Sequence, residues 1–79
     1  MIENDKIITL ANNQKYAILD NFIFEDTKYY IGSLYEDKIT NSIVLLKEKI
    51  DGDKVLIKIV DNQDEIIKAI HYYKKEGNK

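Results

Sequence analysis

The chain has 79 residues, of which 44% are hydrophobic and 33% are charged, and its formal net charge at pH 7 is −2. This length suits one domain with one hydrophobic core, and the hydrophobic share is too high for a disordered chain. The sequence contains no cysteine and no arginine, which excludes disulfides, thiolate metal sites and the bidentate guanidinium contacts that commonly read phosphate or guanine.

The N-terminal residues 1–6 lack the basic start and the apolar stretch of a signal peptide. No apolar run in the sequence approaches the roughly 20 residues that span a bilayer. The absence of cysteine also fits a reducing compartment. We therefore expect a soluble, cytoplasmic protein that has no membrane partner.

The first β-type run, residues 7–10, is short and rich in β-branched side chains, which favour strands. Asn12 and Asn13 follow it, and asparagine readily takes the left-handed conformations that a tight turn needs. Because this run is short and comes first in the chain, we expect an edge strand that another polypeptide could pair with.

The second β-type run, residues 16–24, is interrupted by Asp20 and Asn21. A β-bulge at this interruption would let Leu19 and Phe22 reach the same core despite their opposite parity. The sequence therefore predicts a bulged or bent strand here.

A third strand is predicted over residues 28–34, where Gly32 marks a bend or a close approach of two backbones. After a polar segment, residues 43–50 form the fourth predicted strand and residues 55–60 the fifth. Asp51 and Gly52 between them predict a hairpin, with these two residues at the centre of a type I′ turn.

A helix is predicted over about residues 62–76. Asn62 is a favourable N-cap, and Glu65 stands three residues later as its capping-box partner. At helical spacing one stripe is apolar and is formed by Ile66, Ile67, Ala69, Ile70 and Tyr73. Tyr72 lies outside this stripe, so we expect it to be exposed and available to a partner.

No connection between the predicted strands is long enough for a crossover helix, so neighbouring strands should pair antiparallel. The sequence thus predicts a single α+β domain over residues 1–79. Its antiparallel meander sheet of about five strands, within residues 6–60 and able to curl strongly, has one C-terminal helix packed on one face.

The sequence offers no set of residues for catalysis. His71 is the only histidine, and neither Ser33 nor Ser42 has a neighbour in sequence that would activate it as a nucleophile. Asp51 and Asp53 flank a glycine but lack the other positions of a calcium loop. We predict no enzymatic activity, no cofactor and no metal site.

The six tyrosines of the chain could stack on the bases of a nucleic acid strand. Against this, a net-negative chain without arginine gains little from the release of counterions, which dominates nucleic-acid affinity. The sequence therefore disfavours a nucleic-acid partner.

The segments that carry a family resemblance are Ile8-Thr9-Leu10, Ile18-Leu19-Asp20 with Phe22, Lys28-Tyr29-Tyr30-Ile31, Leu45-Leu46-Lys47, Asp51-Gly52-Asp53 and Ile57-x-Ile59-x-Asp61. In this order they resemble the YrzB-like family of small cytosolic proteins from low-GC Gram-positive bacteria, over most of the chain. Members of that family carry dense acidic tracts and a glycine in the first turn, whereas this chain has Asn12 and Asn13 there and a nearly balanced charge. The resemblance implies no activity and no catalytic residues.

We expect a non-enzymatic protein-interaction or regulatory module that uses either an edge strand or the sheet face without a helix. The candidate interaction residues are Tyr72, Ile7, Ile8, Leu10, Val44, Leu46 and Leu56. Because one helix cannot cover apolar residues on both faces of the strands, we also expect a homodimer.

The alternative is an inhibitor, encoded by a phage or another mobile element, that occupies a site of a host enzyme. A version that mimics DNA would need a contiguous acidic face. The candidates for such a face are Glu25, Asp26, Glu36 and Asp37.

Overall fold

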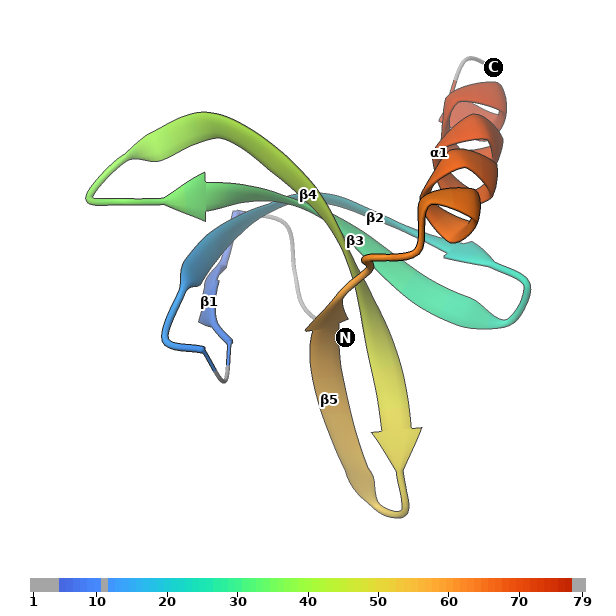
Figure 1. Ribbon diagram of the computed structural model, residues 1–79, viewed down its shortest axis with the longest axis horizontal. Helices are drawn as coiled ribbons and strands as arrows, with labels where there is room; N and C mark the ends of the chain where they lie inside the picture. The colour runs from blue at the N-terminus through green and yellow to red at the C-terminus, as the bar shows by residue number, and fades with distance from the viewer. Residues whose placement is uncertain (1–4, 11, 78–79) are drawn as a thin grey trace.

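The computed structural model describes residues 5–10 and 12–77 and confirms the predicted α+β fold (Figure 1). The five strands are β1 (Ile7–Thr9), β2 (Lys15–Phe24), β3 (Thr27–Tyr35), β4 (Ile39–Asp51) and β5 (Lys54–Ile59), and the helix is α1 (Gln63–Gly77). Each strand pairs antiparallel with the next one, in the order β1-β2-β3-β4-β5. The sheet is therefore a meander, strongly curled into a half-barrel, and β1 is an edge strand as predicted.

The curled sheet buries apolar residues on both of its faces. The cluster on one face, which we call the inner cluster, consists of Tyr16, Ile18, Tyr30 and Leu46. The cluster on the other face, which we call the helix cluster, consists of Tyr29, Leu45, Val60 and Ala69. Adjacent residues such as Tyr29 and Tyr30 belong to different clusters because successive strand side chains point to opposite faces.

A bulge in β2 changes which residues face which cluster. The register between β2 and β3 shifts between Ile18 and Asp20, which makes Leu19 the extra residue. Ile18 belongs to the inner cluster, whereas Phe22, of the same parity, packs on the helix cluster. The predicted bulge is confirmed, but it lies one residue earlier than expected. It also leaves Leu19 38% exposed, so the prediction that Leu19 and Phe22 share a core is wrong.

The two short hairpin turns differ from each other in type, and the β4–β5 turn also differs from its predicted type. In the β2–β3 turn both Glu25 and Asp26 have positive φ, at 50° and 62°, which is the backbone of a type I′ turn. In the β4–β5 hairpin, whose presence is confirmed, the two loop residues are Gly52 and Asp53, and only Gly52 has positive φ, at 66°. This is the pattern of a type II′ turn. The predicted type I′ turn centred on Asp51 and Gly52 is therefore wrong by one residue and in type.

Gly32 lies where β3 passes beneath a core side chain. It pairs with Ile18 on one side and Val44 on the other. A Cβ atom at this position would lie 3.0 Å from Cδ1 of Leu46. The predicted close approach is confirmed, and its effect is to let the buried Leu46 side chain fold over β3.

Helix α1 packs on the sheet through four of the five residues of the predicted stripe, because Ala69 belongs to the helix cluster, Ile66 and Ile70 pack on it and the Tyr73 ring contacts that of Phe22. Ala69 is fully buried. The distance between the ring centroids of Tyr72 and Phe24 is 5.0 Å. Ile67, which was expected in the packed stripe, is 65% exposed. The prediction that Tyr72 is exposed is also wrong, because the aromatic side chains of β2 extend to the C-terminal half of α1 and cover it.

Candidate functional site

The two edge strands of the curled sheet line the same groove. Among residues 5–10 and 12–77, β1 and β5 do not pair with each other, so the sheet stays an open half-barrel. The groove between them has a volume of about 460 Å³ and is lined by residues 8–10 on one side and by Lys49 and residues 55–58 on the other. We call it the seam groove. It is the place where the sheet would accept a further strand.

The outer edge of β5 presents free backbone groups to this groove. The N–H of Val60 donates to the carbonyl oxygen of Leu45 at 2.8 Å. This bond shows which residue pairs of the β4–β5 ladder are hydrogen-bonded to each other and which are not. In an antiparallel ladder of this register, the N–H and C=O groups of Val55 and Ile57 point away from β4. No described residue pairs with them. Within the described part of the chain, these groups therefore remain open to pairing with an added strand.

Apolar side chains form the floor of the seam groove. Ile8, Leu10 and Ile57 are half-buried and pack against the inner cluster. Val55 is 58% exposed and continues the same surface towards solvent. A side chain bound here would gain roughly 25 cal/mol for each Å² of apolar surface removed from water.

Lysines border the seam groove on the face of the sheet that carries α1. Lys58 stands directly opposite Lys47 in the β4–β5 ladder, and Lys47 has a carboxylate partner, since its Nζ lies 3.0 Å from Glu65. Lys49, Lys54 and Lys58 are exposed and form no ion pair with any described residue. This border is therefore positive, although the whole chain carries a net charge of −2.

A second hollow, of about 520 Å³, lies beside the seam groove, between the β2–β3 turn and the β4–β5 hairpin. Figure 1 shows these two hairpins diverging from the centre of the sheet. The charged residues that line the hollow are Asp26, Lys28, Lys47, Glu48, Lys49 and Lys58. Because Lys49 and Lys58 line both hollows, the positive border of the seam groove continues around the β4–β5 hairpin.

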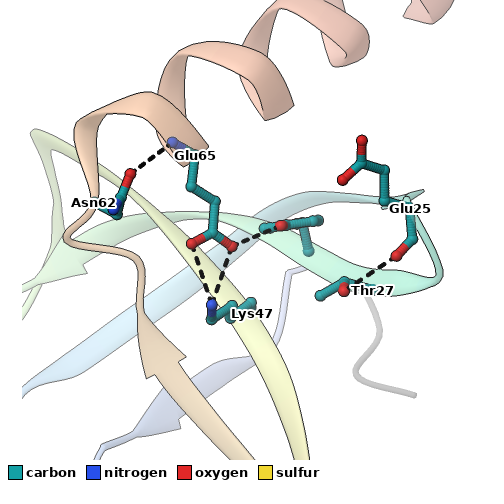
Figure 2. A network of polar contacts seen from close by, with 6 residues as sticks. Glu25, Thr27, Lys47, Asn62 and Glu65 are labelled. Atoms are coloured by element: carbon teal, nitrogen blue, oxygen red, sulfur yellow. Dashed lines mark hydrogen bonds and ion pairs between the residues drawn. The ribbon is translucent and has the colours of Figure 1, made fainter.

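A network centred on Glu65 holds the start of α1 on the sheet (Figure 2). The Tyr29 hydroxyl donates to Oε2 of Glu65 at 2.7 Å, and Nζ of Lys47 lies 3.0 Å from the same oxygen. The backbone N–H of Glu65 donates to Oδ1 of Asn62 at 3.0 Å, so the predicted N-cap is confirmed. The reciprocal half of the predicted capping box is wrong, because the Glu65 carboxylate turns to Tyr29 and Lys47 instead.

This network determines the protonation states of its members. Burial and the hydrogen bond to Glu65 raise the pKa of Tyr29 to about 12. The hydrogen bond from Tyr29 lowers the pKa of Glu65, and Lys47 acts in the same direction. At neutral pH Tyr29 is therefore a neutral donor and Glu65 an ionised acceptor, which suits a structural contact better than proton transfer.

A second polar contact joins the C-terminal half of α1 to the bulge in β2. The Tyr73 hydroxyl donates to Oδ2 of Asp20 at 2.5 Å. This hydrogen bond, together with burial, raises the pKa of Tyr73. Both helix contacts were missed in the sequence because 36 and 53 positions separate the partners.

The structure brings three of the seven predicted interaction residues together. Ile8 and Leu10 line the seam groove from the β1 side, and Leu56, which is 43% exposed, lines it from the β5 side. The sequence showed the alternating apolar residues of β5, but it did not show that the curl would place them opposite β1. Val55 and Ile57, which complete the groove, were therefore missed as site residues.

The other four predicted interaction residues lie outside the seam groove. Ile7 is exposed, whereas Tyr72 packs on Phe24. Val44 is half-buried against the inner cluster, and Leu46 is fully buried within it. The proposal of Leu46 as a contact residue is wrong, because the curl of the sheet covers this face without a second copy.

The predicted acidic face is not contiguous. Glu25 and Asp26 form the β2–β3 turn, and Glu36 and Asp37 follow the opposite end of β3. A nine-residue strand separates the two pairs by about 30 Å at the usual strand rise. All four side chains are exposed, but they make two separate acidic corners.

His71 is exposed and borders a shallow hollow of about 380 Å³ on α1 together with Lys68, Tyr72 and Lys75. In the described part of the chain, no group of three or more histidine, aspartate and glutamate side chains is arranged to hold a metal ion. With 15 residues and many charged side chains, α1 has neither the length nor the apolar character for crossing a bilayer.

Comparisons with family models, with curated proteins and with solved structures give no match for this chain. The resemblance to the YrzB-like family therefore stays a prediction that rests on the sequence segments given above.

Proposed function

We propose that the protein is a non-enzymatic interaction module that binds another polypeptide in the seam groove. One observation carries this proposal: the free backbone edge of β5 at Val55 and Ile57 lies directly beside an apolar groove whose far wall is β1. Backbone edges give affinity to an added strand, and adjacent apolar pockets give it specificity.

The absence of enzymatic activity is part of this proposal. The polar residues with perturbed pKa values, Tyr29, Glu65 and Tyr73, are all engaged in contacts between α1 and the sheet. Neither His71 nor Ser33 has a described neighbour that would activate it, since the Ser33 hydroxyl donates to the carbonyl oxygen of Thr40. The groove itself is lined by apolar residues, Thr9 and lysines.

The proposal is tested by placing a photocrosslinking amino acid at Leu56, on the wall of the seam groove, in cells that make the protein naturally. The matched control carries the same amino acid at Lys38, which is exposed in the β3–β4 turn and lines none of the hollows described above. We expect a discrete adduct with another polypeptide from position 56 and none from position 38. Irradiation that gives no adduct specific to position 56 would rule the module out.

A second copy of the chain is the competing occupant of the groove. An adduct at twice the mass of the chain, and no other, would replace the external partner by the homodimer expected from the sequence. An adduct with an enzyme whose activity falls on binding would favour the inhibitor alternative. The two separate acidic corners give no support to the version of that alternative that mimics DNA.

A further inference from the structure

We infer that the seam groove recognises an extended strand in which apolar and acidic side chains alternate, and that this strand pairs with the free edge of β5. The inference rests on the proposed function and deepens it by naming the chemistry of the partner. It follows from three properties of β5: its backbone edge, its two side-chain faces and its uncompensated charge.

The backbone edge requires an extended partner. The N–H and C=O groups of Val55 and Ile57 point away from β4, and no described residue binds them. Only a chain in β conformation can meet both residues, because groups on one edge of a strand recur at every second residue. A helix or a folded surface would leave these groups without partners.

The two faces of β5 require different side chains on alternate residues of that partner. Val55 and Ile57 point to the face of the inner cluster, towards Ile8 of β1 across the groove. Lys54 and Lys58 point to the opposite face. A strand added beside β5 continues both faces, so one set of its side chains meets an apolar floor and the other set meets two lysines with Leu56 between them.

The charge on the lysine face favours acidic residues in the second set. On this face the β4–β5 hairpin carries four lysines and one carboxylate, namely Lys47, Lys49, Lys54, Lys58 and Asp51. Glu65 neutralises Lys47, but Lys49, Lys54 and Lys58 have no ion pair with a described residue. Opposite charges in directly facing positions stabilise a strand pair, and like charges destabilise it.

The same lysines work against a second copy of this chain. Two copies could pair through their β5 strands, antiparallel and centred on Leu56, with their apolar faces on the same side. This pairing would set Lys54 of each copy opposite Lys58 of the other. Charged residues on an edge strand commonly prevent association with neutral or like-charged edges. In this protein they leave the edge open to a strand that carries the opposite charge.

The test uses the full chain, labelled with nitrogen-15, and two octapeptides that differ only in charge. One alternates valine with glutamate and the other alternates valine with lysine. We expect the glutamate peptide to bind about tenfold more tightly or better, as two or three reversed cross-strand charge pairs imply. We also expect hydrogen-exchange protection of the amides of Val55 and Ile57, and a preference that shrinks as salt is added.

Two variants of equal charge separate the proposed site from a general effect of charge. Lys54→Glu combined with Lys58→Glu should reverse the preference, so that the lysine peptide binds more tightly. Lys38→Glu combined with Lys68→Glu makes the same change at exposed positions outside the seam groove, and the original preference should remain. Circular dichroism verifies that both variants are folded.

Each other result overturns the inference. Equal binding of both peptides, with protection at Val55 and Ile57, means that the edge accepts strands without selecting charge. Binding without protection at these amides, or no binding of either peptide, means that β5 does not pair with an acidic strand. In all of these cases an adduct from position 56 with another polypeptide would still support the interaction module, so the two proposals fail separately.

Discussion

The hydroxyl of Tyr29 lies 2.7 Å from the carboxylate of Glu65, although 36 positions separate the two residues in the chain. Tyr29 belongs to β3 and Glu65 to the first turn of α1, so this hydrogen bond crosses from the sheet to the helix (Figure 2). Its acceptor is ionised, and it lies beside the buried helix cluster. Docking of α1 therefore depends on a polar contact as well as on apolar packing.

Tyr29→Phe should lower the free energy of unfolding by about 1–2 kcal/mol, because it removes a hydrogen bond to a charged group and leaves Glu65 with a single side-chain partner. Urea unfolding at pH 7 measures the loss. Tyr35→Phe is the control, since the Tyr35 hydroxyl has no hydrogen bond with a described residue, and its effect should be below about 0.5 kcal/mol. Equal losses in the two variants would contradict a specific role for the contact.

The pKa of Tyr29, raised to about 12, predicts a loss of stability in alkali. A raised pKa means that folding favours the neutral phenol, so its contribution is complete below the unfolded pKa near 10 and disappears as the pH rises towards 12. Glu65 has a lowered pKa, so its contribution is complete above about pH 4.3 and is lost as the pH falls through the folded value. Urea unfolding across these ranges should show both declines, and Tyr29→Phe should flatten the alkaline one.

Replacing Glu25 by Asn and Asp26 by Gly should stabilise the protein by about 1–2 kcal/mol. Both residues have positive φ, which costs most side chains energy, and Asn-Gly is the preferred pair for a type I′ turn. The opposite control is Gly52→Ala, which should destabilise by about 1 kcal/mol through its φ of 66° alone, since no atom lies within 4 Å of the added methyl group. Thermal unfolding of both variants measures these effects. If the midpoint temperature of neither variant changed, the turn assignments would be contradicted.

Gly32→Ala should destabilise the fold by about 1–3 kcal/mol, because its Cβ would lie 3.0 Å from Cδ1 of Leu46. Shortening the neighbour by Leu46→Val costs stability by itself but makes room for the new methyl group. In a double-mutant cycle the two changes should therefore couple favourably, by about 0.5 kcal/mol or more. Strict additivity of the two losses would show that Gly32 is required for another reason.

Tyr72→Ala should cost about 2–3 kcal/mol, whereas Ile67→Ala should change the stability by less than about 0.5 kcal/mol. Tyr72 packs on the ring of Phe24, whereas Ile67 is 65% exposed, although both residues border the same shallow hollow on α1. Chemical denaturation of the two variants measures the difference. The opposite order would mean that Ile67, as expected from the sequence, and not Tyr72 belongs to the packed face of α1.

The order of the elements, the antiparallel meander and the single covering helix were predictable, because each depends on local signals. Short β-branched runs, the Asp51 and Gly52 hairpin signal and the Asn62 cap act within a few residues. Gly32 was also interpreted correctly as a close approach. The type of the β4–β5 turn was not, since a shift of one residue in the loop places Gly52 first instead of second.

Three further features escaped prediction because they depend on the bulge and the curl of the sheet. Parity alone could not assign Leu19, because a bulge inverts the faces of the residues that follow it. Helical spacing alone could not choose between Ile67 and Tyr72, because the choice depends on where the aromatic side chains of β2 lie. The seam groove needs contacts between the first and the last strand, and no local pattern reports their proximity.

The edge strand β5 has a neighbouring strand on one side only. β5 pairs with β4, and beyond Lys47 no other described strand supports that pair. Ile50 near the hairpin tip is 74% exposed, so little burial opposes fraying of this hairpin. The β4–β5 hairpin should therefore be the first part of the sheet to open and the last to form. A strand that pairs with β5 would have to order this hairpin, and part of its binding free energy would be spent on that ordering.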